Sequence, residues 1–118
     1  MEFFDRLFNR PAINQLEPAQ VHERMAQSPR PFLLDVRTPN EYKEVHINGA
    51  ELIPLNEITA KLNKIPKGRE IICVCASGSR SSTAARQLLS LGFNVSNLRG
   101  GMSHWIRAGL PTKKGAGK

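Results

Sequence analysis

One short segment of the chain combines a potential nucleophile with groups that stabilise negative charge. Residues 75–81 read CASGSRS and continue the most apolar run of the sequence, residues 71–75. Small residues and a glycine after Cys75 allow the backbone to curl, so that successive N–H groups converge on the sulfur. Those donors, the positive end of a following helix and the Arg80 guanidinium all favour a thiolate over a neutral thiol. The segment therefore predicts that Cys75 is ionised at neutral pH and attacks anionic substrates.

The second cysteine is predicted to have a structural role. Cys73 lies two residues before Cys75 and points to the same face of the expected strand, but its apolar neighbours are typical of a core position. A disulfide between the two would close a very small, strained ring, so it is not expected.

Several charged and aromatic residues outside this segment are also expected to be structural. Asp35 ends a strand, and Arg37 is expected to pair with Glu41 or Glu44, which would form an ion-pair brace under the loop. Asp35, Arg37 and Ser81 are thus predicted to support the reactive loop. No general base is needed, because the predicted thiolate is already ionised. Structural roles are likewise expected for His46, His104 and Trp105.

Short apolar runs alternate with helical patterns along the chain, and this alternation defines the expected fold. Strands are predicted at residues 32–36, 50–53, 71–75 and 93–98. Helices are predicted at residues 17–25, from 38 onward, and at 55–62, 81–91 and 102–108. Such alternation is typical of right-handed crossovers. It indicates an α/β protein, a three-layer α/β/α sandwich around a mainly parallel sheet of four to five strands. In such a sheet the junction at Cys75 would lie at the carboxyl edge, where ligands bind.

The length of 118 residues allows one domain, which we place at residues 11–112. Residues 1–10 form a short amphipathic segment with an apolar stripe, which could pack on its own domain, on a dimer partner, on another protein or on a membrane surface. The apolar stripe of residues 1–10 consists of Phe3, Phe4, Leu7 and Phe8. Residues 113–118 are predicted to be a flexible basic tail.

Composition excludes several classes of protein. The net charge is +7, with net −3 in residues 1–60 and net +10 in residues 61–118, so the second half should attract anions. No nucleic-acid-binding motif accompanies this charge, and nucleic acid is not an expected partner. No apolar run is long enough to span a membrane and no signal peptide is recognisable, so we expect a cytoplasmic protein. Two cysteines and three scattered histidines cannot build a zinc site, and neither a metal nor a cofactor is predicted.

Further motifs occur in an order that resembles the rhodanese-like sulfurtransferase family over about a hundred residues, 11–111. Besides residues 75–81, they are LDVR at 34–37, HINGA at 46–50 leading into IPL at 53–55, and LRGGM at 98–102 followed by Trp105 and GLP at 109–111. The resemblance implies a single-domain sulfurtransferase of the thiosulfate sulfurtransferase type, in which Cys75 forms a persulfide. The implied anion cup is the backbone of Ala76, Ser77, Gly78, Ser79 and Arg80.

The implied reaction has two steps. The Cys75 thiolate takes the outer sulfur of a donor such as thiosulfate, with Arg80 neutralising the donor's charge, and a thiophilic acceptor then removes it. The acceptor would be cyanide, glutathione or the dithiol of a protein such as a thioredoxin-like one. Two alternatives remain: a persulfide carrier or docking module without turnover, and a cysteine-dependent phosphatase or arsenate reductase. The second is disfavoured because those enzymes place five residues between cysteine and arginine, whereas this chain has four.

Overall fold

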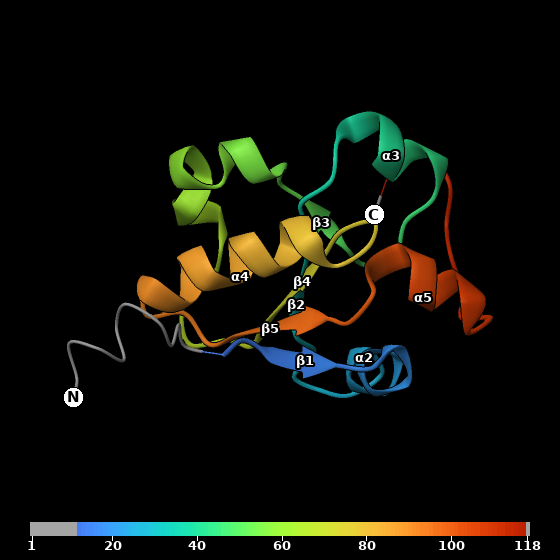
Figure 1. Cartoon of the computed structure of the whole chain (residues 1–118), viewed down its shortest axis with the longest axis horizontal. Coiled ribbons are helices and arrows are strands. Elements are labelled where there is room, and N and C mark those ends of the chain that lie inside the picture. The colour runs from blue at the N-terminus through green and yellow to red at the C-terminus, as the bar shows by residue number, and fades with distance from the viewer. Residues whose placement is uncertain (1–11, 118) are drawn as a thin grey trace.

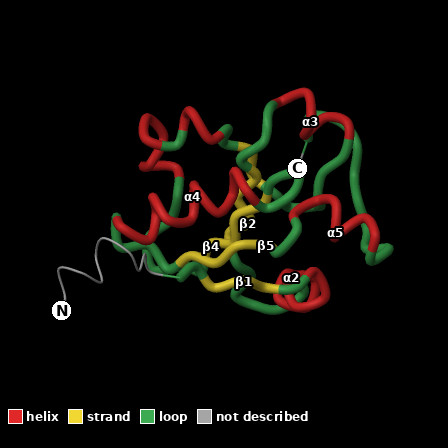
Figure 2. The backbone as a smooth tube through the Cα atoms, in the orientation of Figure 1, coloured by secondary structure: helices red, strands yellow, loops and turns green. Residues whose placement is uncertain are grey.

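The computed structural model describes residues 12–117 and contains one five-stranded sheet in which all strand pairs are parallel (Figures 1 and 2). The strand order is β1-β5-β4-β2-β3, so β4, which leads to Cys75, lies in the middle of the sheet. The predicted parallel α/β sheet is thereby confirmed. The strands are β1 (Asn14–Leu16), β2 (Phe32–Asp35), β3 (Glu51–Leu52), β4 (Ile71–Val74) and β5 (Val95–Leu98).

Helices cover both faces of this sheet, which gives the expected three layers. One face packs against α4 and two short 3₁₀ helices, whereas the other packs against α2, α3 and α5. The helices are α2 (Pro18–Met25), α3 (Pro39–Glu44), α4 (Ser79–Ser90) and α5 (Gly101–Arg107), and the 3₁₀ helices are Leu55–Glu57 and Thr59–Lys64.

The central strand shows why its sequence is apolar throughout. All four residues of β4 are buried, and successive side chains point to opposite faces. Ile71 and Cys73 lie in the core beneath α4, whereas Ile72 and Val74 lie in the core beneath α2, α3 and α5. Cys75 belongs to the same core as Cys73, as predicted. The sulfur of Cys75 is therefore at the edge of the α4 layer, where the chain turns toward that helix.

Some predicted elements differ from the structure. The segment 55–62 was predicted to be one helix but forms the two 3₁₀ helices, with a kink at Lys61. The edge strand β1 was not predicted, because NQL has no apolar alternation; it is held by pairing with β5. The helix α4 begins at Ser79, two residues earlier than expected. This early start places Arg80 inside the first turn of the helix and not in the loop.

The two ends of the chain have different outcomes. The predicted amphipathic segment 1–10 lies outside the described residues. In the predicted tail, Lys113 exchanges two backbone hydrogen bonds with His46 (2.9 and 2.8 Å), and the Gly115 amide donates to the Lys43 carbonyl (2.8 Å). These bonds attach the beginning of the tail to the domain. Within residues 12–117, the helices are too short and too polar to cross a membrane.

Candidate active site

The candidate site is the loop between β4 and α4, which we call the cysteine loop (residues 75–78). It leaves the central strand at the carboxyl edge of the sheet, where ligands of parallel α/β proteins bind. Gly78 is the N-cap residue of α4 and has a left-handed φ of 102°, which a residue with a side chain rarely adopts. A Cβ atom there would also lie 3.2 Å from the backbone nitrogen of Gly100. The glycine therefore allows the tight turn that brings the start of α4 back to the sulfur.

Several donors converge on the sulfur of Cys75. The Gly78 amide donates to Sγ at 3.0 Å, and the Ser81 hydroxyl lies 3.3 Å from Sγ and 3.3 Å from the Gly78 carbonyl oxygen, either of which accepts its proton. Burial of the thiol raises its pKa, but the Ser81 hydroxyl and the backbone amides of Ser81, Gly78 and Ser77 lower it by more, so that the pKa of Cys75 lies below its ordinary value. Ser81, predicted only to support the loop, thus contacts the sulfur directly. The arrangement stabilises a thiolate, the nucleophilic form of cysteine.

Cys73 has the opposite environment. It is fully buried, and burial together with the negative charge of Cys75 raises the pKa of its thiol strongly. Both cysteines are free. Cys73 is therefore an unreactive thiol in the core, as the sequence predicted.

The carbonyl of Gly78 fixes the loop by accepting hydrogen bonds from α4 and β5. It accepts hydrogen bonds from the Ser82 amide (3.1 Å), the Ser82 hydroxyl (2.7 Å) and the Asn97 side-chain amide (3.4 Å). Asn97 is buried at the end of β5 and also donates to Gln15 at 2.9 Å. The neighbouring strands β5 and β1 therefore help to fix the loop. Sequence reasoning missed Asn97, whose only signal is an amide side chain in a predicted buried strand.

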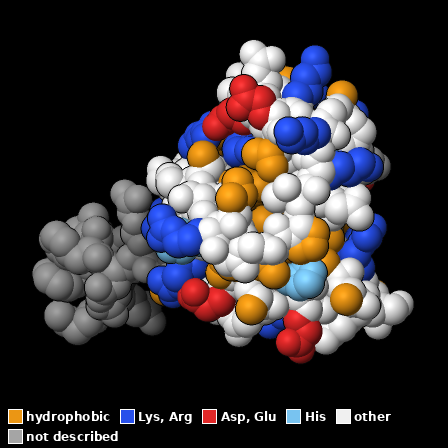
Figure 3. Space-filling model, turned by 90° about the vertical axis from the view of Figure 1, so that its right-hand side faces the viewer, with side chains coloured by type: hydrophobic (Ala, Val, Ile, Leu, Met, Phe, Trp, Pro, Cys, Tyr) orange, Lys and Arg blue, Asp and Glu red, His pale blue; other side chains and the backbone are white. Residues whose placement is uncertain are grey.

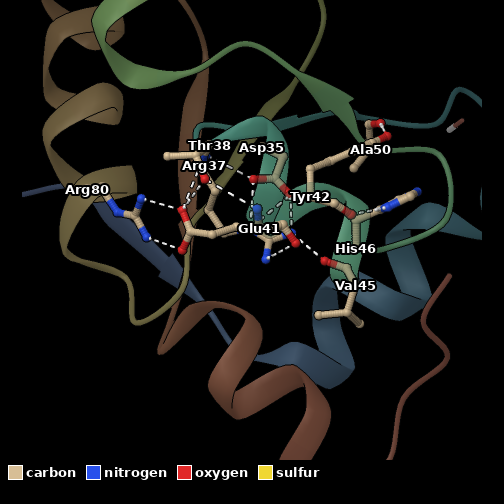
Figure 4. Close-up of polar contacts among 9 residues, drawn as sticks. All are labelled: Asp35, Arg37, Thr38, Glu41, Tyr42, Val45, His46, Ala50 and Arg80. Carbon is tan, nitrogen blue, oxygen red and sulfur yellow. Dashed lines mark hydrogen bonds and ion pairs between the residues drawn. The ribbon is translucent and has the colours of Figure 1, made fainter. Parts of the chain in front are cut away.

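Arg80 was predicted to face the donor, and here the structure differs. Its guanidinium forms two hydrogen bonds with the Glu41 carboxylate, at 2.7 and 2.8 Å, as Figure 4 shows. The Arg80 hydrogen bond holds the pKa of Glu41 at about 2, although partial burial opposes the shift. The physical reason is the early start of α4, which directs Arg80 toward α3 at the rim of the loop. Arg80 therefore lies at the rim of the site with its charge paired with that of Glu41.

The brace predicted for Arg37 also has a different partner. Arg37 does not pair with Glu41 or Glu44; it lies buried against Asp35, with guanidinium–carboxylate distances of 2.8 to 3.2 Å. Its remaining donors bind the carbonyls of Glu41 (3.4 Å) and Val45 (2.7 Å) in α3 and at its end (Figure 4). Asp35 and Arg37 thus fasten α3 to β2, and the Glu41 side chain of α3 in turn binds Arg80 at the start of α4.

Removing Asp35 should destabilise the fold far more than removing Arg80. Asp35→Ala leaves the Arg37 guanidinium buried without its counter-charge, which costs about 3 to 5 kcal/mol of unfolding free energy. Arg80→Ala breaks an ion pair that is about one-third exposed and should cost no more than about 1 kcal/mol. Urea denaturation of the two variants tests this difference. Equal losses would show that the Asp35–Arg37 pair is not the structural brace.

Of the other residues singled out in the sequence, two are buried in the core and one is exposed. His46 is buried, stacks on the Tyr42 ring at 3.8 Å and lies 2.8 Å from the Tyr42 carbonyl through Nδ1. Trp105 is buried in the core and donates to the Pro111 carbonyl at 2.9 Å. His104 is exposed on α5. Among residues 12–117 no three side chains of His, Cys, Asp or Glu cluster as metal ligands would.

Comparison with known proteins assigns this loop and fold to a family. The model of the Rhodanese-like domain matches residues 17–108, which include the whole sheet except β1. The chain belongs to the rhodanese-like domain family. A sulfurtransferase of Allochromatium vinosum is 36% identical over 100 residues, covering 84% of this chain and 94% of that protein. A crystal structure of a rhodanese-related protein from Thermoplasma volcanium superimposes with a TM-score of 0.79 at 29% identity, covering 85% of this chain and 97% of that one.

Another relative of this rhodanese-like domain bears a different name. A putative sulfur carrier protein of Bacillus subtilis, YrkF, is 42% identical over 74 residues, covering 62% of this chain but only 40% of that protein. The sulfurtransferase relatives support a sulfurtransferase activity for the rhodanese-like chain.

The structure brings the predicted loop residues together, but with distinct contacts. The Gly78 amide donates to the sulfur and the Ser77 amide lowers the pKa of the thiol, whereas Ser79 begins α4. The Ala76 carbonyl is bound by the Ser103 amide of α5 at 3.0 Å. This contact with α5 was missed, because the glycine pair before it was interpreted only as a turn.

Proposed function

We propose that the protein transfers sulfane sulfur through a persulfide on Cys75. The Cys75 thiolate attacks the outer sulfur of a donor such as thiosulfate, the new S–S bond forms, and the bond to the departing sulfite breaks with its electron pair. A thiolate or cyanide then attacks the terminal sulfur, takes it, and releases the Cys75 thiolate. No external base, oxidant or metal is required.

The observation that carries this proposal is the set of donors around the Cys75 sulfur. The Gly78 amide and the Ser81 hydroxyl lie 3.0 and 3.3 Å from Sγ, and the backbone amides of Ser77 and Ser81 also lower the pKa of the thiol. These groups stabilise the thiolate before attack and the terminal sulfur, which also carries negative charge, afterwards. A buried cysteine with only a packing role needs none of them.

Charge near the loop supports an anionic donor. Arg80 lies at the rim of the loop, and the chain carries a net charge of +7; on the face shown in Figure 3 the Lys and Arg side chains are widely spread, with a few Asp and Glu side chains among them. Such a surface raises the local concentration of a small anion. We propose thiosulfate as the donor class, and glutathione, cyanide or a protein dithiol as the acceptor class.

Intact-protein mass spectrometry after incubation with thiosulfate tests the proposal. The expected result is a gain of about 32 Da, one sulfur, which is lost on addition of cyanide or glutathione. No gain with thiosulfate or with an organic polysulfide would contradict sulfur transfer. Hydrolysis of an aryl phosphate without sulfur uptake would favour a phosphatase.

The similarity to a putative sulfur carrier protein keeps a second function in consideration. A carrier would accept one sulfur on Cys75 and release it only to a dedicated partner, whereas an enzyme would turn over many times with small thiols. Steady-state product formation from thiosulfate and glutathione separates them. We expect multiple turnovers, and release limited to one sulfur per chain would instead support the carrier.

A further inference from the structure

The first turn of α5 binds the cysteine loop through two main-chain hydrogen bonds. The Met102 amide donates to the Cys75 carbonyl at 2.8 Å, and the Ser103 amide donates to the Ala76 carbonyl at 3.0 Å. Amides in the first turn of a helix have no partner within the helix. Here these two find their partners in successive peptide groups that begin the loop.

Binding a carbonyl also fixes the direction of the next amide. In a planar trans peptide the C=O and N–H bonds point in opposite directions, so the carbonyl held by α5 turns the following N–H away from α5. The peptides held in this way carry the amides of Ala76 and Ser77. The Ser77 amide is one of the groups that lower the pKa of Cys75. The contact with α5 thus orients a donor that acts on the sulfur.

Gly101 permits this contact. It has a left-handed φ of 58°, and a Cβ atom on it would lie 2.2 Å from the Cys75 carbonyl oxygen and 2.9 Å from the carbonyl group of Ala76. These neighbours are backbone atoms and cannot rotate away. Any side chain at this position must push the start of α5 away from the loop.

We propose that Gly101 is a positioning residue for sulfur transfer, because its missing side chain lets α5 hold the Cys75 and Ala76 carbonyls and so directs the loop amides at the sulfur. The inference rests on the proposed function of Cys75. It assigns to the second glycine of the Gly100-Gly101 pair a role in the reactivity of a residue 26 positions earlier in the chain.

The test compares Gly101→Ala with Gly109→Ala. Gly109 lies just after the same helix with a φ of 74°, and a Cβ atom there meets nothing within 4 Å, so this control reproduces the backbone strain without the clash. The pH dependence of Cys75 alkylation by iodoacetamide, followed by peptide mapping, gives the pKa of Cys75 in each variant. In Gly101→Ala we expect the midpoint of the alkylation profile to rise by about one pH unit or more, which lowers the alkylation rate about tenfold at pH values below both midpoints. In Gly109→Ala the midpoint should move by no more than about 0.3 unit.

An unchanged midpoint in folded Gly101→Ala, or an equal shift in both variants, would overturn the proposal. If Gly101→Ala does not fold, the wild-type protein still provides a test. The amide protons of Met102 and Ser103 should then exchange with solvent at least about 100-fold more slowly than in an unfolded chain. Their chemical shifts should also change as the Cys75 thiol ionises. Rapid exchange and no movement would overturn the role of α5.

Neither measurement requires a sulfur donor. A wild-type protein that gains no sulfur would therefore contradict the proposed function, whereas a Cys75 midpoint that Gly101→Ala leaves unchanged would contradict only the positioning role.

Discussion

Replacing Cys75 by serine should abolish sulfur uptake and reduce sulfur transfer at least about 10³-fold, because a serine hydroxyl is not ionised near neutral pH and forms no persulfide. The matched control is Cys73→Ser, two residues earlier on the same strand and in the same core. It should retain transfer, since burial raises the pKa of Cys73 and keeps it a thiol. Rates of sulfite release from thiosulfate measure both variants.

The two variants also separate reactivity from folding. Cys73→Ser places a hydroxyl at a fully buried position and should lower stability, whereas Cys75 already lies among polar donors at the loop. We therefore expect the less stable variant to be the active one. An active Cys75→Ser protein with an inactive, folded Cys73→Ser protein would move the nucleophile to Cys73.

Removing the positive charge of Arg80 and removing the negative charge of Glu41 should change the rate of reaction with an anionic donor in opposite directions. Arg80→Ala removes the cation and leaves the Glu41 carboxylate, which stays ionised and negatively charged at neutral pH. We expect its second-order rate with thiosulfate to fall about 10- to 100-fold. Glu41→Gln frees the guanidinium while keeping a polar side chain at the capping position of α3, and should raise that rate several-fold.

An uncharged organic trisulfide provides the control donor, because the donor itself carries no negative charge for Arg80 to attract, although Cys75 still attacks as a thiolate and an anionic sulfur group leaves. Its rate should change less than about threefold in both variants. Between pH 4 and pH 8 the wild-type pair should remain ionised, since Glu41 loses its charge only near pH 2. Equal losses with both donors would exclude Arg80 from donor recognition and leave it a structural role only.

The reactive segment could be predicted from the sequence because its determinants are local. An apolar run followed by cysteine, small residues and glycine is sufficient to predict a buried strand, a tight turn and a helix N-terminus around one sulfur. The structure places these elements as β4, the cysteine loop and α4. The fate of Cys73 follows from strand alternation in the same way.

Partners supplied by other elements could not be predicted in this way. Whether Arg37 pairs with Asp35 or with Glu41 depends on how α3 packs against β2. The direction of the Arg80 side chain depends on the start of α4 at Ser79, which the sequence pattern did not predict. The role of Gly101 depends on a close approach to a carbonyl 26 residues away in the sequence. These contacts follow from tertiary packing, and local sequence patterns do not encode them.

The most direct test of the central claim is a pH titration of the wild-type protein labelled with ¹³C at the cysteine Cβ atoms. Because the resonance of each Cβ moves when its thiol ionises, the two cysteines are followed separately and no reagent must reach the buried sulfur. We predict that Cys75 titrates below the ordinary value of 9.0, whereas Cys73 remains a thiol over the pH range in which the protein is folded. Titration of Cys75 at or above 9.0 would contradict the account.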